Sequence, residues 1–201
     1  TMIVSEATYE TSAPTISSQL ATLKASGANV MFGVVLGKFT SQMIKGAAEI
    51  NWKPDLFFVP TSASSISFLE PAGLDNAVGL ISSSNQKDTL DAQWANDEGV
   101  KEYFAFMKKY LPNADLSNSN YAAGFQYATL MVKVLSACNG DFSRPNIMKQ
   151  AASLREVPLP LLLPGITVST DSEDYLPFQQ LRLRRFDGKS WVAFGDILDD
   201  R

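Results

Sequence analysis

The sequence contains no histidine and only one cysteine. Without an imidazole, a Ser-His-Asp or Cys-His catalytic arrangement is excluded, and so are the usual zinc sites. The single cysteine, Cys138, cannot form a disulfide within the chain. It lies on an apolar helical stretch, where a free cysteine usually packs as a small buried hydrophobe. These absences remove most of the common routes to catalysis.

Several motifs that would identify a function are also missing. No apolar run approaches the roughly 18 residues that a membrane span requires, and the amino terminus has no basic, apolar signal segment. The phosphate loop G-x-x-x-x-G-K-[ST], the G-x-G-x-x-G fingerprint and the G-x-S-x-G nucleophile motif do not occur. A net charge of −4 over 201 residues argues against nucleic acid or an anionic membrane as partner. The sequence therefore predicts no cofactor, no metal and no nucleic-acid partner.

Apolar strands alternate with helical patterns through the first part of the chain. The strands read as near-continuous apolar runs, which is typical of a parallel sheet buried on both faces. This order predicts an α/β fold with right-handed crossovers. The expected strands cover residues 2–9, 30–36, 56–59 and 78–82, and the expected helices run from Ser12 to Gly27 and over residues 39–50.

The pattern changes near residue 84, where a polar stretch predicts a crossing into another part of the fold. Three helices are expected beyond it, and the second is apolar nearly all round, which predicts a central position. Short strands follow, and Asp187-Gly188 between two of them is a hairpin signal. The expected helices cover 97–111, 120–138 and 143–154, and the expected strands cover 166–168, 180–186 and 190–194.

Two charged clusters favour solvated surfaces over sites. The acidic run Asp171-Ser172-Glu173-Asp174 lacks the spacing and glycine of a calcium loop, so a solvated turn is the better interpretation. Basic residues beside aromatic ones can indicate nucleic acid. On one hairpin of an acidic protein they more often mark a solvated strand edge, as we expect for Arg182, Arg184, Arg185 and Lys189.

Two strand-to-helix junctions are the candidate binding site. In a parallel sheet both emerge at the same edge, where α/β folds hold their ligands, and helix starts there favour an anionic or strongly polar group. Lys38 could pair with a ligand carboxylate or be an ordinary surface lysine, whereas Ser64 and Ser65 are expected to cap the following helix. The candidate ligand-binding residues are Leu36, Gly37, Lys38, Thr61, Ser62 and Ala63.

Specific stretches resemble a known family. Residues 18–28, SQLATLKASGA, followed by an apolar strand, resemble the second lobe of type I periplasmic solute-binding proteins, the branched-chain amino acid-type receptors of ABC importers. The tail, with LPGI at 163–166, Asp174-Tyr175 and QLRLRRFDGKSWV at 180–192, is similar to the subgroup that often takes aromatic and other small organic acids. The similarity extends over essentially the whole chain.

This resemblance implies two Rossmann-like lobes that close on a ligand between them. Residues 1–83 resemble part of lobe two, 84–178 the late part of lobe one, and 179–201 a return to lobe two, so the chain is expected to be an N-terminally truncated fragment. The implied function is a periplasmic, non-enzymatic subunit that delivers a small organic, aromatic carboxylate to the membrane subunits of an ABC importer. Branched-chain amino acid binding and a ligand-sensing domain are the alternatives, and the fragment is expected to self-associate.

The resemblance also bears on the ligand class. Amino acid-binding members carry an acidic residue at the position that resembles Thr61, where it receives the ligand ammonium, and often an aromatic residue at the position of Leu36. Here these positions hold a neutral hydroxyl and an aliphatic side chain. We therefore expect a carboxylate ligand without an amine.

Overall fold

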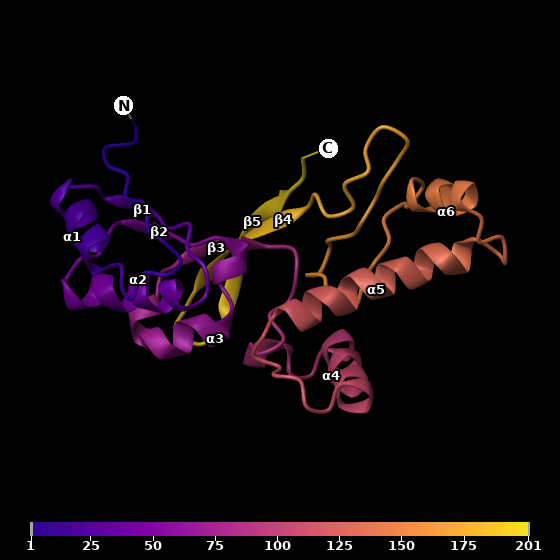
Figure 1. Cartoon of the computed structure of the whole chain (residues 1–201), viewed down its shortest axis with the longest axis horizontal. Coiled ribbons are helices and arrows are strands. Elements are labelled where there is room, and N and C mark those ends of the chain that lie inside the picture. The colour runs from indigo at the N-terminus through magenta and orange to yellow at the C-terminus, as the bar shows by residue number, and fades with distance from the viewer. Residues whose placement is uncertain (1, 201) are drawn as a thin grey trace. The chain divides into compact units, whose positions relative to one another are not determined.

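The computed structural model describes residues 2–200 and has a mixed α/β architecture (Figure 1). Its contacts divide the chain into two compact units. Unit 1 comprises the chain up to Ser83 together with Leu183–Phe194, and unit 2 comprises Ser84–Arg182 together with the tail from Gly195 onward. The carboxyl-terminal segment therefore contributes to both units.

Unit 1 contains a mostly parallel sheet. Its first three strands are neighbours, with Phe32 paired to Phe58 and Phe58 paired to Ile81, all in parallel. The last two strands extend the sheet and are joined by a turn too short for a parallel crossover, so they form a hairpin. The α/β prediction is confirmed. The order along the sheet is β1 (Val30–Phe32), β2 (Leu56–Phe58), β3 (Ile81–Ser84), β4 (Leu181–Phe186) and β5 (Trp191–Leu198).

Helices of unit 1 pack their apolar faces into its core. The helix α2 (Lys38–Glu49) buries Phe39, Met43, Ile44 and Ala47, the face that the helical spacing predicts. The helix α1 (Ser17–Ala25) begins later than expected, after Pro14, and Gly27, just past its carboxyl end, has a φ of 76° that favours glycine. Shorter elements are α3 (Ile66–Leu69) and the 3-10 turns η1 (Thr61–Ala63), η2 (Glu70–Ala72) and η3 (Leu74–Ala77).

Two expectations for unit 1 are wrong. The strand β1 is buried on one face only: Met31 is buried, whereas Val30 and Phe32 are exposed. Residues 2–9 form no strand. Strand structure needs a hydrogen-bonded neighbour, and this segment does not pair with β1; instead the ring of Tyr9 packs on Phe39 at 4.6 Å between centroids.

Unit 2 contains three long helices, which lie close to their expected bounds: α4 (Glu98–Tyr110), α5 (Asn120–Ala137) and α6 (Arg144–Ala151). The 3-10 turn η4 (Ala92–Trp94) precedes them. Cys138 is buried and free, as predicted. No strand forms at 166–168, where a single antiparallel bridge joins Val157 and Val168.

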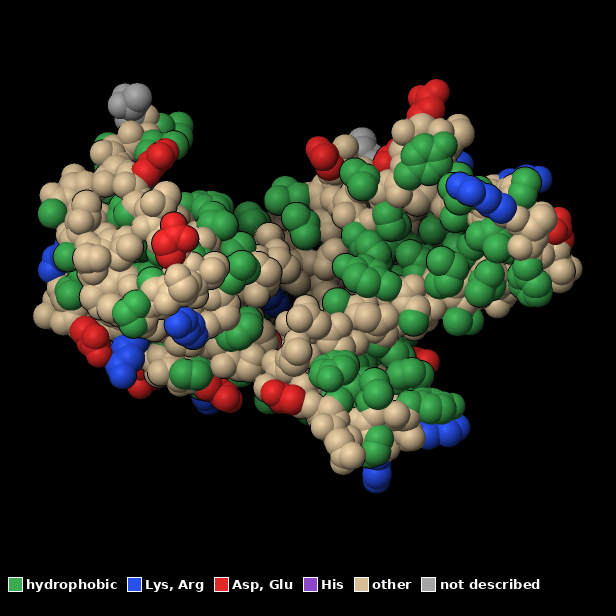
Figure 2. Space-filling model, viewed as in Figure 1, with side chains coloured by type: hydrophobic (Ala, Val, Ile, Leu, Met, Phe, Trp, Pro, Cys, Tyr) green, Lys and Arg blue, Asp and Glu red, His purple; other side chains and the backbone are tan. Residues whose placement is uncertain are grey.

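The helix α5 is less enclosed than its all-round apolar character predicts. Its buried residues are confined to Ala122, Phe125, Gln126 and Val134. Figure 2 shows hydrophobic side chains gathered over the part of unit 2 that contains this helix. The large exposed apolar residues of α5 are Tyr127, Met131 and Val132.

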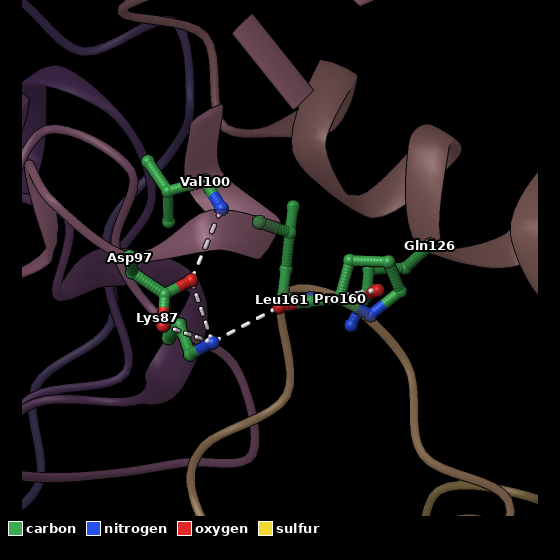
Figure 3. Close-up of polar contacts among 6 residues, drawn as sticks. All are labelled: Lys87, Asp97, Val100, Gln126, Pro160 and Leu161. Atoms are coloured by element: carbon green, nitrogen blue, oxygen red, sulfur yellow. Dashed lines mark hydrogen bonds and ion pairs between the residues drawn. The ribbon is translucent and has the colours of Figure 1, made fainter. Parts of the chain in front are cut away.

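An ion pair between the buried Lys87 and the half-buried Asp97 fixes the start of unit 2 (Figure 3). The side chain of Lys87 donates to both carboxylate oxygens of Asp97 at 2.8 Å and to the carbonyl oxygen of Pro160 at 3.0 Å. Asp97 also caps α4 by accepting a hydrogen bond from the Val100 N–H at 3.1 Å. The Lys87 N–H donates to Leu161 O, so one residue ties the chain after β3 to two other segments.

The loop at Pro160 and Leu161, which Lys87 contacts, also packs against α4 and α5. Gln126 of α5 accepts a hydrogen bond from the Leu161 N–H at 3.1 Å. At Gly99, in the first turn of α4, a Cβ would stand 2.0 Å from Pro160 O, so a side chain there would collide with backbone. The polar stretch after residue 84 is thus a tightly packed junction.

Candidate functional site

The candidate site lies at the carboxyl-terminal edge of the sheet in unit 1. The parallel pairing continues past the strand ends, where Gly33 donates to Phe58 O at 3.0 Å and Val59 donates to Ile81 O at 2.9 Å. The segments that follow β1, β2 and β3 therefore leave the sheet at the same edge. This brings the two predicted junctions onto neighbouring strands.

The first junction, after β1, presents an apolar side chain and a lysine. Leu36 is 57% exposed, and Gly37 has a φ of 54°, a left-handed conformation that favours glycine. The N–H groups of Phe39 and Thr40 donate to Leu36 O and Gly37 O. Two of the helix-start donors are therefore engaged locally, and the junction offers fewer of them to a ligand than the pattern predicts.

Lys38 is exposed, and its ammonium group is held by nearby groups of unit 1. It donates to Ala13 O at 3.0 Å and lies over the ring of Phe39 at 4.9 Å from the centroid. These contacts draw it toward the segment before α1. Its role as a partner for a ligand carboxylate remains a prediction.

The second junction, after β2, is a row of hydroxyls. Thr61 and Ser62 are exposed in the turn η1. The Thr61 hydroxyl donates to Ser83 O at 2.8 Å and lies 3.2 Å from Ser83 Oγ. Ser83 comes from β3, so hydroxyl groups following two neighbouring strands meet at this edge.

The residues beneath this turn are buried. Ala63 is 0% exposed and belongs to the core, and its N–H donates to Pro60 O at 3.0 Å. Its side chain therefore supports the turn from beneath. The prediction that Ser64 and Ser65 cap the next helix is wrong: α3 has no side-chain cap, and the Ser64 hydroxyl donates back to Thr61 O at 2.7 Å.

No acidic residue follows any of the three strands within residues 33–40, 59–69 or 82–87. The nearest carboxylates along the chain are Asp55, before β2, the exposed Glu70, after α3, and Asp88, four residues after β3. The edge therefore presents hydroxyl groups and backbone groups without a negative side chain. Such a surface suits an anionic or neutral polar ligand better than a cation.

Sequence reasoning missed Ser83 and Tyr9. The Tyr9 hydroxyl accepts a hydrogen bond from the Leu36 N–H at 3.2 Å and so fixes the first junction. The serine run Ser82-Ser83-Ser84 at the end of β3 repeats the pattern of hydroxyls after β2 and could have been found by that signal. Nothing in the sequence connects Tyr9 to a residue 27 positions later.

Unit 2 has a surface hollow of about 390 Å³ of its own, lined by Arg155, Glu156, Ser169, Thr170, Asp171 and Asp174. Its polar groups bind one another. Arg155 donates to Thr170 O, and Asp171 accepts from the N–H groups of Glu173 and Asp174, which makes the acidic run the predicted turn. Within residues 2–200 no group of three or more Cys, Asp or Glu residues could hold a metal ion.

None of the helices described for this chain combines the length and apolar character needed to cross a membrane. The architecture, a parallel α/β sheet with polar junctions at its carboxyl edge and a second, helix-rich unit, is that of a type I periplasmic binding fold. A family model described as periplasmic binding protein matches residues 1–190. The chain belongs to this family. No curated protein matches it.

Solved structures agree with this assignment at low sequence identity. A branched-chain amino acid ABC transporter protein from Thermus thermophilus with bound valine superposes with a TM-score of 0.76 at 13% identity, covering 92% of this chain and 50% of that one. A leucine-binding protein from Thermotoga maritima gives 0.65 at 12% identity, covering 96% and 51%. A solute-binding protein from R. palustris in complex with 4-hydroxybenzoate gives 0.69 at 16% identity, covering 98% and 52%. The chain thus spans about half the length of the structures it matches.

Proposed function

We propose that this protein is a periplasmic solute-binding subunit that delivers a small organic carboxylate to the membrane subunits of an ABC importer, without converting it. Membership of the periplasmic binding protein family supports a binding role. The observation that carries the ligand class is the edge formed by Thr61, Ser62 and Ser83, which presents hydroxyl groups and has no acidic residue within 59–69 or 82–87. The similar fold of the 4-hydroxybenzoate complex is consistent with an aromatic ligand.

Hydroxyl groups can hold a carboxylate here because Ser62 is exposed and Ser83 is half-buried beside Thr61. Hydrogen bonds to a charged acceptor are about twice as strong as neutral ones. Leu36, exposed after the neighbouring strand, gives an apolar surface for the body of the ligand. We assign ligand contacts to Leu36, Gly37, Lys38, Thr61 and Ser62, with Ala63 as support.

Branched-chain amino acid binding is the second candidate, because the valine-bound and leucine-binding structures share this fold. Both ligand classes carry a carboxylate, and they differ in the α-ammonium group. The absence of an acidic residue at the edge is the reason for ranking the amine-free class first. A ligand-sensing domain on the same fold would bind through the same residues.

We expect the protein to bind 4-hydroxybenzoate and return it chemically unchanged. No nucleophile and base are placed together at the edge, so there is no group to carry a reaction. The measurement is equilibrium dialysis at millimolar ligand followed by mass spectrometry of the recovered small molecule. Recovery of a converted product would contradict the binding role, and a Thr61→Ala variant that binds as well as the parent chain would contradict the site.

We further propose that copies of this chain associate through exposed apolar faces. Phe32 of β1 and Val132 of α5 are both more than half exposed, although parallel strands and all-round apolar helices are normally covered. Sedimentation is expected to show a concentration-dependent dimer, and Val132→Lys is expected to weaken it. The control is Ala21→Lys, which adds the same charge at an exposed position of α1. A clean monomer at high concentration would refute this association.

A further inference from the structure

Two residues of the carboxyl-terminal hairpin reach the candidate ligand edge from more than a hundred positions away. Arg184 of β4 is 6% exposed, which contradicts the prediction of a solvated hairpin edge at this position. Its guanidinium donates to Ser64 Oγ at 2.5 Å. Trp191 of β5, also buried, donates from its indole N–H to Ser64 O at 2.8 Å. All three residues belong to unit 1.

Ser64 connects the hairpin to the turn η1, which carries Thr61 and Ser62. It is fully buried, and its hydroxyl accepts from Arg184 while donating to Thr61 O at 2.7 Å. Its N–H also donates to Thr61 O, at 3.3 Å. A continuous chain of hydrogen bonds therefore runs from the hairpin through Ser64 to Thr61, whose own hydroxyl donates to Ser83 O.

The two hairpin residues also fix each other. The guanidinium of Arg184 lies over the Trp191 ring, 4.6 Å from its centroid, and the ring of Phe186 lies 5.4 Å from that of Trp191. A planar guanidinium can stack on a ring and donate at the same time, which the ammonium group of lysine cannot do with the same geometry. Both donors thus approach Ser64 in a single orientation.

From this geometry we propose that Arg184 and Trp191 are positioning residues of the ligand edge. They hold the carbonyl and hydroxyl of Ser64, and thereby orient Thr61 and Ser62 beside β3. Side chains that place binding groups in advance reduce the ordering cost of binding. Arg184 also places a positive charge beneath the turn, which favours an anionic ligand over a cationic one. The inference rests on the proposed binding function for its effect on affinity, but not for its effect on the turn.

The first test needs no ligand. In Trp191→Phe the ring remains but the hydrogen bond to Ser64 O is lost. Amide hydrogen exchange at Ala63 and Ser64 is expected to speed up about tenfold, the factor expected for losing one buried hydrogen bond. The matched control is Trp52→Phe, which removes the same atoms from the same core. Unchanged exchange in Trp191→Phe, or equal acceleration in both variants, would overturn the proposal.

The second test asks whether the positive charge of residue 184 is sufficient without the stacked guanidinium geometry. Arg184→Lys keeps the positive charge and loses the stacked geometry, whereas Arg184→Met loses both. A positioning role predicts faster exchange at Ala63 and Ser64 in both variants. Exchange in Arg184→Lys that equals the parent chain's would overturn the role of Arg184.

The third test uses 4-hydroxybenzoate as the probe. Trp191→Phe is expected to weaken its binding several-fold, while Trp52→Phe leaves it unchanged at a comparable loss of thermal stability. Equal affinities of Trp191→Phe and the parent chain would show that the turn needs no positioning and would overturn the proposal. If the parent chain binds no probe but the exchange results hold, the positioning stands and the proposed function fails.

Discussion

Replacing Lys87 with methionine is expected to lower the free energy of unfolding of unit 2 by about 1–3 kcal/mol, the cost of leaving hydrogen-bonding groups without their partner; the Asp97 carboxylate that stays behind is 25% exposed, so water offsets part of the loss. The Lys87 side chain is 9% exposed, and its ammonium group contacts both oxygens of Asp97. Methionine keeps the apolar stem but leaves the Asp97 carboxylate and the Pro160 carbonyl without this donor. Urea-dependent amide exchange of α4 measures the change within unit 2.

An exposed ion pair on the same helix provides the control. Lys101 and Glu98 also lie 2.8 Å apart, but their side chains are 49% and 88% exposed. Because water screens such a pair, Lys101→Met is expected to cost less than about 1 kcal/mol. Similar losses in the two variants would contradict the argument from burial. Adding Asp97→Asn to Lys87→Met should restore part of the stability, since asparagine still caps the helix and carries no charge.

The same pair makes stability depend on acid pH. Burial alone would raise the pKa of Asp97, but the hydrogen bond from Lys87, the Val100 and Gly99 N–H groups and the lysine charge together lower it below its ordinary value of 3.8. A carboxyl group with a lowered pKa stabilises the fold above its unfolded-state pKa. That contribution is lost as the pH falls through the folded-state pKa. The stability difference between the parent chain and Lys87→Met should therefore shrink below about pH 4.

Local pattern was sufficient where the contacts are local. The buried face of α2 follows from the spacing of Phe39, Met43, Ile44 and Ala47 alone, and Gly27 ends α1 because of its left-handed φ. The parallel sheet follows from the alternation of strands and helices. These predictions depend on residues a few positions apart.

Sequence patterns gave wrong predictions where burial or strand pairing depends on a segment far away in the sequence. Residues 2–9 have strand composition, yet no described strand pairs with them. The apolar surface of α5 predicts burial, but the described residues leave Met131 exposed. Local sequence shows which residues are apolar enough to be buried. Whether they are buried depends on which distant segments pack against them.

The candidate site likewise contains residues that the sequence predicts and residues that it does not. The hydroxyls of Thr61 and Ser62 could be predicted, because the carboxyl ends of parallel strands share an edge. Arg184 could not, because the run LRLRR reads as an alternating, solvated strand, and its partner Ser64 is 120 residues away. The role of Lys87 could not be predicted either, because it lies in a polar stretch that resembles a linker. Its side chain donates to Pro160 O, 73 residues later in the sequence.

The proposed ligand class is expected to show as a large preference between molecules that differ by one amine. Leucine and 4-methylpentanoate share the carboxylate and the branched body, but only leucine carries an α-ammonium group. A buried ammonium without a partner costs about 3–5 kcal/mol, or roughly a hundredfold to a few thousandfold in affinity. Thr61 can accept one hydrogen bond but carries no charge, and residues 33–40, 59–69 and 82–87, which follow the three strands, contain no acidic side chain. We therefore expect 4-methylpentanoate to bind at least about a hundredfold more tightly than leucine.

A thermal-shift series tests this preference, with the pairs leucine and 4-methylpentanoate, valine and 3-methylbutanoate, and with 4-hydroxybenzoate as the aromatic member. A ligand at about twenty times its Kd stabilises the chain by about 1.8 kcal/mol, whereas one that binds a hundredfold more weakly contributes about 0.1 kcal/mol. In Thr61→Glu the added carboxylate would pair with an ammonium and repel an anion, so the preference should reverse toward leucine. A larger shift with leucine than with 4-methylpentanoate in the parent chain would overturn the assignment, because the ammonium would then have a partner that this edge does not supply.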